Sequence, residues 1–253
     1  MASRKPNLTV ISGGGGGIGT AVVHQLCGRD SHSLVALIDL DFPSRDALTA
    51  SFGRRVTFHE CDVTVPPQVT AVVAAIVQAE HSSLALVNGA GRVSNTPSLE
   101  LSVETWRSVV DSHLTGAFIL TQAIARVMAN EGGGAIVNIG SIAGLFGHPR
   151  RLPYSVAKAG LHQMARTLAV EWADYNIRVN AVAPGFVETP MFTRVRELGL
   201  IDAEAAANLH AMKRVAEPRE IAAAIVFLLD DDAGFITGET LVVDGGYSVY
   251  KAT

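Results

Sequence analysis

The sequence predicts an α/β fold, in which a doubly wound parallel sheet of about seven strands carries helices on both faces within one domain, 1–253. Short β-rich runs alternate with longer segments of helical spacing from one end of the chain to the other. A glycine-rich turn joins the first strand to the first helix. No linker rich in Ser, Pro or Gly divides the 253 residues, a length that one α/β domain commonly has.

The predicted strands are short apolar runs, and in chain order they cover residues 8–11, 34–38, 56–59, 84–87, 135–139, 178–182 and 241–243. Helical spacing of apolar residues predicts helices near 18–28, 43–52, 66–79, 103–130, 154–174 and 218–229. Pro66 and Pro67 suit the first turn of the third helix, where a missing N–H does no harm. Alternation of this kind favours a parallel sheet covered on both faces.

The segment 186–214 breaks this rhythm with a long excursion before the last predicted helix. Long loops at the carboxyl end of a parallel sheet often carry function. We therefore expect a substrate lid here, and a merely structural pair of helices is the alternative.

Composition narrows the class of partner. A formal charge of −4 and a pI near 6.0 provide no basic stripe for nucleic acid or for an acidic membrane. The longest apolar runs, 71–77 and 221–229, are much shorter than the ~20 residues of a membrane helix, and the N-terminus has no apolar run typical of a secretory signal. Cys27 and Cys61 are expected to be buried thiols. We expect a cytoplasmic protein that acts on a small molecule, without a metal.

The glycine turn lies in "TVISGGGGGIGTAVV", residues 9–23. Gly13, Gly17 and Gly19, with Ile18 between the last two, have a Gly-x-x-x-Gly-x-Gly spacing between a strand and a helix. Backbone N–H groups and the helix dipole can receive a pyrophosphate there. The intervening glycines, 14–16, are expected to matter chiefly for the side chains they lack. A flexible surface loop is the alternative.

Asp39 favours the nucleotide reading, because it ends the second strand 20 residues after Gly19. A carboxylate at this place can accept both hydroxyls of an adenosine ribose, and its charge would repel a 2′-phosphate. Leu40 follows it and is expected to contact the cofactor, while Asp41 adds a second negative charge. The turn contains no Lys or Arg. NAD is therefore predicted over NADP, and an ordinary polar strand end is the alternative.

A catalytic group is expected where "GSIAG" ends a strand at Ser141 and "YSVAK" begins a helix at Tyr154. Lys158 lies four residues after Tyr154 and so shares its helical face. The ammonium and the helix N-terminus are both expected to lower the pKa of the phenol, which would let it exchange a proton with an alcohol. Taken alone, such a pair is usually an amphipathic surface pair.

Several motifs occur together in the order of one family: "SGGGGGIG", Asp39, "CDVT", "NGAG", "GSIAG", "YSVAK", "APGFVET" and the terminal "ITGETLVVDGG". The sequence resembles the single-domain short-chain dehydrogenase/reductases over nearly its whole length, which implies a Rossmann-like fold. The resemblance implies that Ser141 polarises the substrate oxygen, that Tyr154 is the acid/base, and that Lys158 holds the nicotinamide ribose. It also implies cofactor contacts with the adenine (Asp62, Val63), with the ribose (Asn88, Ala90, Gly91) and with the nicotinamide (Pro184, Gly185, Val187, Thr189).

The chain departs from the family pattern at three places. "DSHLTGAF" puts His113 where the family usually has an Asn linked to a water relay that reaches the lysine. We expect His113 to support a modified relay, since imidazole can carry protons near neutrality, and a packing role or a crippled relay are the alternatives. Gly89 replaces a common Asn, and Gly16 replaces a Ser or Arg whose absence agrees with NAD.

The residues expected near the substrate are mostly apolar, which predicts a hydrophobic or alicyclic secondary alcohol and its ketone. They are Ser94, Ile142, Leu145, Phe146, His148, Phe186, Met191 and Phe192. Arg150 and Arg151 would meet an anionic substrate at the pocket mouth or form a solvated basic pair. The resemblance also implies a homotetramer, with interfaces on the helices near 103–130 and 154–174 and on the apolar C-terminal segment.

Three functional classes remain open at this point. An NAD-dependent alcohol dehydrogenase or ketone reductase explains Ser141, Tyr154 and Lys158 together and is the predicted function. An NAD-binding sensor or scaffold with weak or no catalysis is the alternative that His113 raises. An epimerase or dehydratase on a related fold would normally need a larger C-terminal domain.

Overall fold

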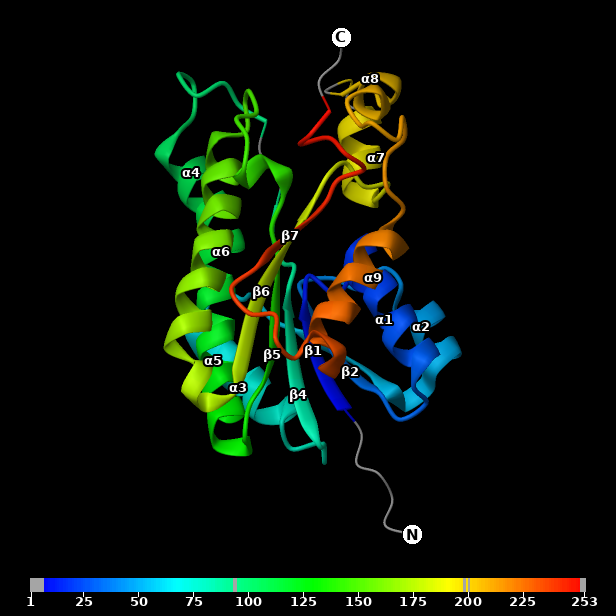
Figure 1. Ribbon diagram of the computed structural model, residues 1–253, viewed down its shortest axis with the longest axis vertical. Helices are drawn as coiled ribbons and strands as arrows, with labels where there is room; N and C mark the ends of the chain where they lie inside the picture. Colours follow the sequence, from blue (N-terminus) through cyan, green and yellow to red (C-terminus); the bar gives the residue numbers. More distant parts are fainter. Residues whose placement is uncertain (1–6, 93–94, 198, 200, 251–253) are drawn as a thin grey trace.

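A seven-stranded parallel sheet forms the centre of the computed structural model, which describes residues 7–92, 95–197, 199 and 201–250 (Figure 1). The strand order is β3-β2-β1-β4-β5-β6-β7. The strands are β1 (Asn7–Ser12), β2 (Leu34–Asp39), β3 (Val56–Glu60), β4 (Ser83–Asn88), β5 (Gly134–Ile139), β6 (Ile177–Pro184) and β7 (Thr240–Val243). Every predicted strand is confirmed within one or two residues at each end.

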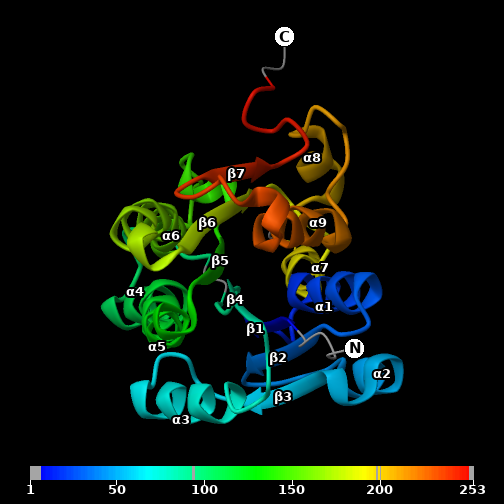
Figure 2. The same ribbon diagram turned by 60° about the horizontal axis from the view of Figure 1, so that its bottom comes forward.

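The crossover helices lie on both faces of the sheet, as predicted. Figure 2 shows α1, α2 and α9 on one side and α3, α4, α5 and α6 on the other. The helices are α1 (Gly17–Arg29), α2 (Arg45–Phe52), α3 (Pro66–Ile76), α4 (Val103–Val110), α5 (Gly116–Glu131), α6 (Leu152–Glu171) and α9 (Pro218–Leu229).

Three predicted helices differ in detail, and the one expected over 66–79 ends at Ile76. The helix expected over 103–130 is divided by a π-helical turn, Asp111–Thr115, which joins α4 to α5 and contains His113. Such turns insert one residue into the helical repeat and often occur at functional sites. Helix α6 begins two residues before its predicted start, because Pro153 fits its first turn, and it ends at Glu171.

Both faces of the strands are buried, so the fold has two apolar cores. Successive residues of a strand alternate between them: Val10 packs in the core beneath α3, α5 and α6, and Ile11 packs in the core beneath α1 and α9. Cys27 and Cys61 are free thiols buried in these cores, as predicted.

The strand order reverses between β1 and β4, which leaves a crevice at their carboxyl ends where ligands of such sheets bind. The excursion 186–214 lies above this end of the sheet and contains α7 (Pro190–Glu197) and α8 (Ala203–Asn208) (Figure 1). In the described ranges, no helix is both long and apolar enough to cross a membrane.

Candidate active site

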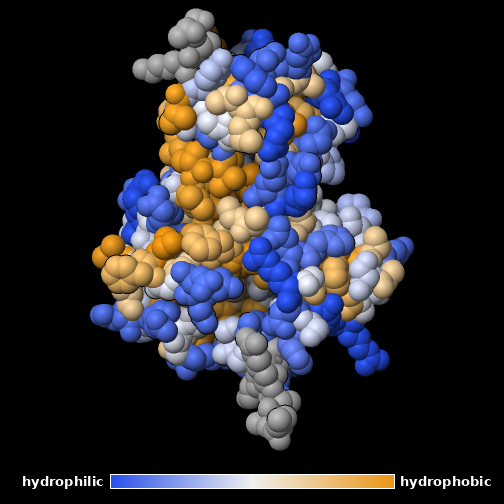
Figure 3. All heavy atoms as spheres, turned by 45° about the vertical axis from the view of Figure 1, so that its right-hand side comes forward, coloured by the Kyte–Doolittle hydropathy of each residue, from blue (hydrophilic) through white to orange (hydrophobic). Residues whose placement is uncertain are grey.

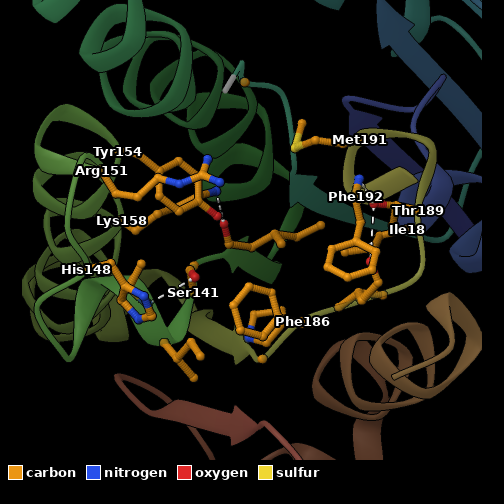
Figure 4. Close-up of a pocket in the computed structure, with 18 of the residues that line it drawn as sticks. Ile18, Ser141, His148, Arg151, Tyr154, Lys158, Phe186, Thr189, Met191 and Phe192 are labelled. Carbon is orange, nitrogen blue, oxygen red and sulfur yellow. Dashed lines mark hydrogen bonds between the residues drawn. The ribbon is translucent and has the colours of Figure 1, made fainter. Parts of the chain in front are cut away.

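A cavity of about 220 Å³ lies at the carboxyl ends of β4, β5 and β6, and Ser141, Tyr154 and Lys158 all line it (Figure 4). Residues of the β6 end and of α7 line its opposite side. The trio expected from the sequence is therefore brought together around one space, although its members come from a loop and from α6.

Ser141 follows β5 and begins a short 3₁₀ turn, Ile142–Gly144. Its hydroxyl oxygen accepts the N–H of Ala143 at 3.1 Å, and its own N–H approaches Nε2 of His162 at 3.4 Å. A Cβ on Gly140 would lie 2.0 Å from that same ring nitrogen, so glycine there makes room for the imidazole. His162 was not recognised from the sequence, and it fixes the loop that presents the serine.

Lys158 is almost completely buried, at 4% exposure, and its ammonium donates to the carbonyl oxygen of Ile139 at 2.6 Å. The nitrogen lies 5.5 Å from the centre of the Tyr154 ring, one turn earlier in α6. Burial lowers the pKa of Lys158 to about 7. The lysine is thus held beside the phenol by a backbone contact at the end of β5.

The pKa of Tyr154 is shifted in the direction opposite to the prediction. Burial raises it, whereas a side-chain hydrogen bond with Ser141 and the charge of Arg151 lower it. The predicted net lowering by Lys158 and the helix N-terminus is therefore wrong for this arrangement, because burial of the phenol outweighs the groups that favour phenolate. The charge that favours phenolate comes from Arg151, for which the sequence allowed either contact with an anionic substrate or exposure to solvent.

His113 is buried in the π-helical turn and lines the cavity. Its Nε2 lies 2.8 Å from the carbonyl oxygen and 3.1 Å from the amide nitrogen of Arg92, so it bonds one or the other according to its tautomer. Nδ1 is buried without a hydrogen-bond partner among the described residues. Its ring packs edge-on against Tyr154, with ring centres 5.2 Å apart.

The expected titration of His113 near neutrality is wrong. Burial is the largest cause, and with the charge of Lys158 it lowers the pKa of His113 to about 3. The imidazole is therefore neutral over the working pH range. Gly91 provides its space, because a Cβ there would lie 1.9 Å from the ring.

The glycine turn packs tightly between β1, β2 and the loop after β4. Gly13 has φ 70, and a Cβ on it would lie 2.4 Å from the Gly89 carbonyl carbon. A Cβ on Gly19 would lie 2.7 Å from the Gly13 oxygen, in agreement with the close helix packing expected there. Gly17 faces Thr189 and Pro190 instead.

Gly14 and Gly15 have a packing role that the sequence did not predict. A Cβ would lie 2.8 Å from Leu37 in the first case and 2.2 Å from the Asp41 oxygen in the second. Their lack of a side chain is therefore a steric requirement as well as an absence of charge.

Asp39 is fixed beside this turn at the end of β2. Its Oδ2 accepts the N–H of Gly15 at 2.9 Å, and its Oδ1 accepts the N–H of Leu40 at 2.8 Å. Each carboxylate oxygen can accept a second hydrogen bond, so the group retains capacity for ribose hydroxyls. The side chain of Leu40 is mostly exposed and does not line the cavity.

The other predicted cofactor residues divide into two groups. The cavity that holds Tyr154 is also lined by Ile18, Gly91, Pro184, Gly185, Val187 and Thr189. Ala90 lies in the same turn as Gly91. Asp62 and Val63 follow β3, where the Asp62 carboxylate accepts the N–H and hydroxyl of Thr64.

The Asn88 side chain does not face the cavity. Its amide donates to Thr121 at 2.7 Å and to Asn138 at 2.9 Å inside the core. The Asn88 side chain hydrogen-bonds β4 to β5 and to α5, so only the backbone of the turn is left for the predicted contact with the ribose.

Most of the residues predicted near the substrate line the cavity that holds Tyr154. Ile142, His148, Phe186, Met191 and Phe192 line the cavity. Leu145 and Phe146 do not; each is 41% exposed, because the 3₁₀ turn directs this part of the loop outward. Ser94 lies outside the described residues. Val195 and Ile201 also line the cavity and were missed, although the apolar spacing of Met191, Phe192 and Val195 in α7 could have indicated the first.

Figure 4 shows Arg151, Tyr154 and Lys158 on one side of the cavity, with Met191 and Phe192 on the other. Met191 and Phe192 of α7 thus form the cavity wall opposite Tyr154 and Lys158, which supports the expectation that segment 186–214 covers the site. Among the described residues, no group of three or more His, Cys, Asp or Glu side chains is placed to hold a metal ion.

Known proteins are similar to this chain over nearly its whole length. A family model described as Enoyl-(Acyl carrier protein) reductase matches residues 14–248. The galactitol 2-dehydrogenase (L-tagatose-forming) of Cereibacter sphaeroides is 37% identical over 243 residues, which cover 95% of this chain and 94% of that protein. The cis-4-hydroxycyclohexanecarboxylate dehydrogenase of Sinomonas cyclohexanicum is 37% identical over 251 residues, covering 95% and 96%. The solved structure of ElxO with NADP bound has a TM-score of 0.89 at 30% identity, covering 98% of this chain and 100% of that one.

Proposed function

Because the chain belongs to the short-chain dehydrogenase/reductases, a family that uses nicotinamide cofactors, we propose that it is an NAD-dependent oxidoreductase that interconverts a secondary alcohol and its ketone. The observation that carries this proposal is the convergence of Ser141, Tyr154 and Lys158 on one cavity. A phenol, a hydroxyl and an ammonium around one apolar space suit proton transfer at a carbon–oxygen bond.

The residues present fit a nicotinamide cofactor. The tight glycine turn follows β1, the Asp39 carboxylate accepts an N–H of that turn, and residues at the end of β6 line the cavity that holds Tyr154. The pyrophosphate would bind at the turn, and Pro184, Gly185, Val187 and Thr189 would hold the nicotinamide. When bound, this group supplies the acceptor or donor of the hydride.

Each member of the trio has a distinct role in the proposal. The Ser141 hydroxyl donates a hydrogen bond to the substrate oxygen, and Tyr154 takes the alcohol proton in oxidation or returns it in ketone reduction. The raised pKa of Tyr154 keeps the phenol protonated near neutrality, which is the form that donates in ketone reduction. Oxidation needs the phenolate, which the hydrogen bond with Ser141 and the charge of Arg151 favour. Lys158 would hold the nicotinamide ribose from its place beside the phenol.

The preference for NAD rests on Asp39. Its carboxylate lies against the glycine turn, where its charge would repel a 2′-phosphate. The similar structure of ElxO has NADP bound, so the fold alone does not decide between the two cofactors.

An apolar secondary alcohol is the proposed substrate class, since Phe186, Met191 and Phe192 line much of the cavity. Relatives named for galactitol and for a hydroxycyclohexanecarboxylate both oxidise a ring or chain alcohol, which supports this reaction class. The sensor or scaffold alternative receives no support from His113, because its ring packs against Tyr154 while the trio remains assembled.

A homotetramer in the cytoplasm remains part of the proposal. Phe118 of α5 and Leu152 and Val156 of α6 are substantially exposed, as are Val249 and Tyr250 of the C-terminal segment. Figure 3 shows apolar residues gathering in a band on the face near the C-terminal end. Exposed apolar surface of this kind suits contact with further copies of the chain.

The proposal is tested with a panel of secondary alcohols, following reduced-cofactor absorbance with NAD⁺ and with NADP⁺. We expect NAD⁺ to be preferred, and we expect Asp39→Ser to move the ratio of kcat/KM values toward NADP⁺ by about 10-fold or more. Asp174→Ser is the control, because Asp174 is exposed in the 3₁₀ turn that precedes β6, at the end of the sheet away from the glycine turn. Equal or better use of NADP⁺ by the unaltered protein contradicts the Asp39 argument.

A further inference from the structure

The structure separates the two neighbouring arginines that the sequence could not distinguish. Arg151 is partly buried and lines the catalytic cavity with Ser141 and Tyr154, whereas the Arg150 side chain is exposed. Arg150 has φ 63, in the left-handed region, and its carbonyl oxygen accepts the N–H of Thr96 at 3.1 Å. This turn immediately precedes α6 and brings Arg151 into the cavity wall.

The cation of Arg151 lies close to the reacting group. Its charge lowers the pKa of Tyr154, so the guanidinium and the phenol share one environment. Figure 4 shows the Arg151 side chain beside the Tyr154 ring. A guanidinium keeps its charge in proteins and has five N–H donors, which can pair with both oxygens of a carboxylate.

His148 adds a second polar group to the same wall. Its ring stacks on Tyr247, with ring centres 5.9 Å apart and planes at 24°. Burial, together with the charge of Arg151, lowers the pKa of His148, so the ring is neutral near neutrality. Its Nε2 is buried without a hydrogen-bond partner among the described residues, so this atom can serve a ligand.

A second cavity, of about 370 Å³, adjoins the first at Arg151 and His148, which line both. The described residues that line the two cavities include Arg150, Arg151 and Lys158 but no Asp or Glu. A basic lining without acidic groups, in a chain with a formal charge of −4, favours an anion over a cation at this place.

We propose that Arg151 and His148 form a subsite for a carboxylate of the substrate, so that the substrate is a hydroxy acid whose apolar ring or chain packs on Phe186, Met191 and Phe192. The inference rests on the proposed oxidation of a secondary alcohol and adds the charged group to that substrate. Arg151 accordingly determines substrate specificity, because it binds the carboxylate at the end of the substrate that lies opposite the reacting carbon.

The test compares two probes that differ only in charge, 4-hydroxycyclohexanecarboxylate and 4-hydroxycyclohexanecarboxamide. The unaltered protein is expected to prefer the acid, and Arg151→Met is expected to reduce the acid-to-amide ratio of kcat/KM values by about 10- to 100-fold, mainly through KM. Loss of the Arg151 charge should also raise the pKa of Tyr154 for both probes, which the ratio cancels. Arg166→Met removes the same charge from the exposed face of α6, outside both cavities, and should change the ratio by less than about 3-fold.

A binding measurement separates this inference from the proposed function. Cyclohexanecarboxylate, which has no alcohol, should bind the cofactor-loaded protein more tightly than cyclohexanecarboxamide, and Arg151→Met should remove the difference. If that difference is present while no alcohol is oxidised, the subsite stands and the dehydrogenase proposal fails. If alcohols are oxidised but Arg151→Met changes neither the binding difference nor the turnover ratio, the carboxylate subsite is overturned.

Discussion

The contact between Gly91 and His113 predicts a large effect for a single added methyl group. In the Gly91→Ala variant the new carbon would lie 1.9 Å from Cε1 and 2.0 Å from Nδ1 of His113. Non-bonded carbon atoms normally approach to about 3.5 Å, so the ring must move by roughly 1.5 Å. Gly91 does not have a positive φ, so the backbone conformation itself is open to alanine.

This movement disturbs the contacts of Nε2 with Arg92, at 2.8 and 3.1 Å. Loss of a buried hydrogen bond costs about 1–3 kcal/mol and overpacking about 1–3 kcal/mol, so the free energy of unfolding should fall by about 2–6 kcal/mol. Urea titration at fixed protein concentration measures the change through the midpoint at constant slope.

Two further variants isolate the cause. In a His113→Ala background the added methyl group enters space left by the imidazole, so its cost should fall below about 1 kcal/mol. Gly28→Ala, inside α1 with nothing within 4 Å of the new carbon, should be neutral or stabilising. An equal cost of Gly91→Ala in both backgrounds would refute the proposed contact.

Lys158→Met is expected to change the pH dependence of stability, because burial lowers the pKa of Lys158 to about 7. An unfolded lysine titrates near ~10.4, so between these two pKa values the unfolded state binds more protons than the folded state. As the pH rises through this window, the free energy of unfolding of the unaltered protein should increase by up to about 1.4 kcal/mol per pH unit relative to the variant. Urea titrations on both sides of this window measure the difference, and parallel pH curves would contradict it. His113→Asn and His113→Ala should alter rate without removing a titration near neutrality, because the pKa of His113 is about 3; a pH–rate limb near pH 6.5 that vanishes in both variants would show that this histidine does titrate. Ser141→Ala should lower kcat/KM by ~10²-fold or more at unchanged cofactor affinity, and activity close to that of the unaltered protein would remove Ser141 from the reaction.

The sequence predicts the sheet, the crossover helices and the trio well, because each depends on local patterning or on spacing within one element. Tyr154 and Lys158 share a face of α6 wherever that helix packs, and Asp39 ends the apolar run that forms β2. The π-helical turn at His113 has no comparable signal, because it inserts a residue without interrupting the helical run of apolar side chains.

Side-chain direction in loops was predicted less well. Leu145, Phe146 and Arg151 lie in one segment between β5 and α6, yet only Arg151 reaches the cavity. The left-handed backbone of Arg150 and the 3₁₀ turn after Ser141 decide this, and neither depends on hydrophobic period. The pKa of Tyr154 was predicted with the wrong sign for a related reason, since burial of the phenol depends on side chains from other segments, such as the His113 ring that packs edge-on against it.

The most direct test of the central claim compares Tyr154→Phe with the unaltered protein, measuring both turnover of a secondary alcohol with NAD⁺ and binding of NADH. Tyr175→Phe is the matched control, because Tyr175 is exposed and lies outside the cavity. Removing one hydroxyl should lower kcat/KM by at least ~10²-fold and leave NADH affinity within about 3-fold, because the phenol serves as the proton carrier. Full activity in Tyr154→Phe would contradict the acid/base assignment.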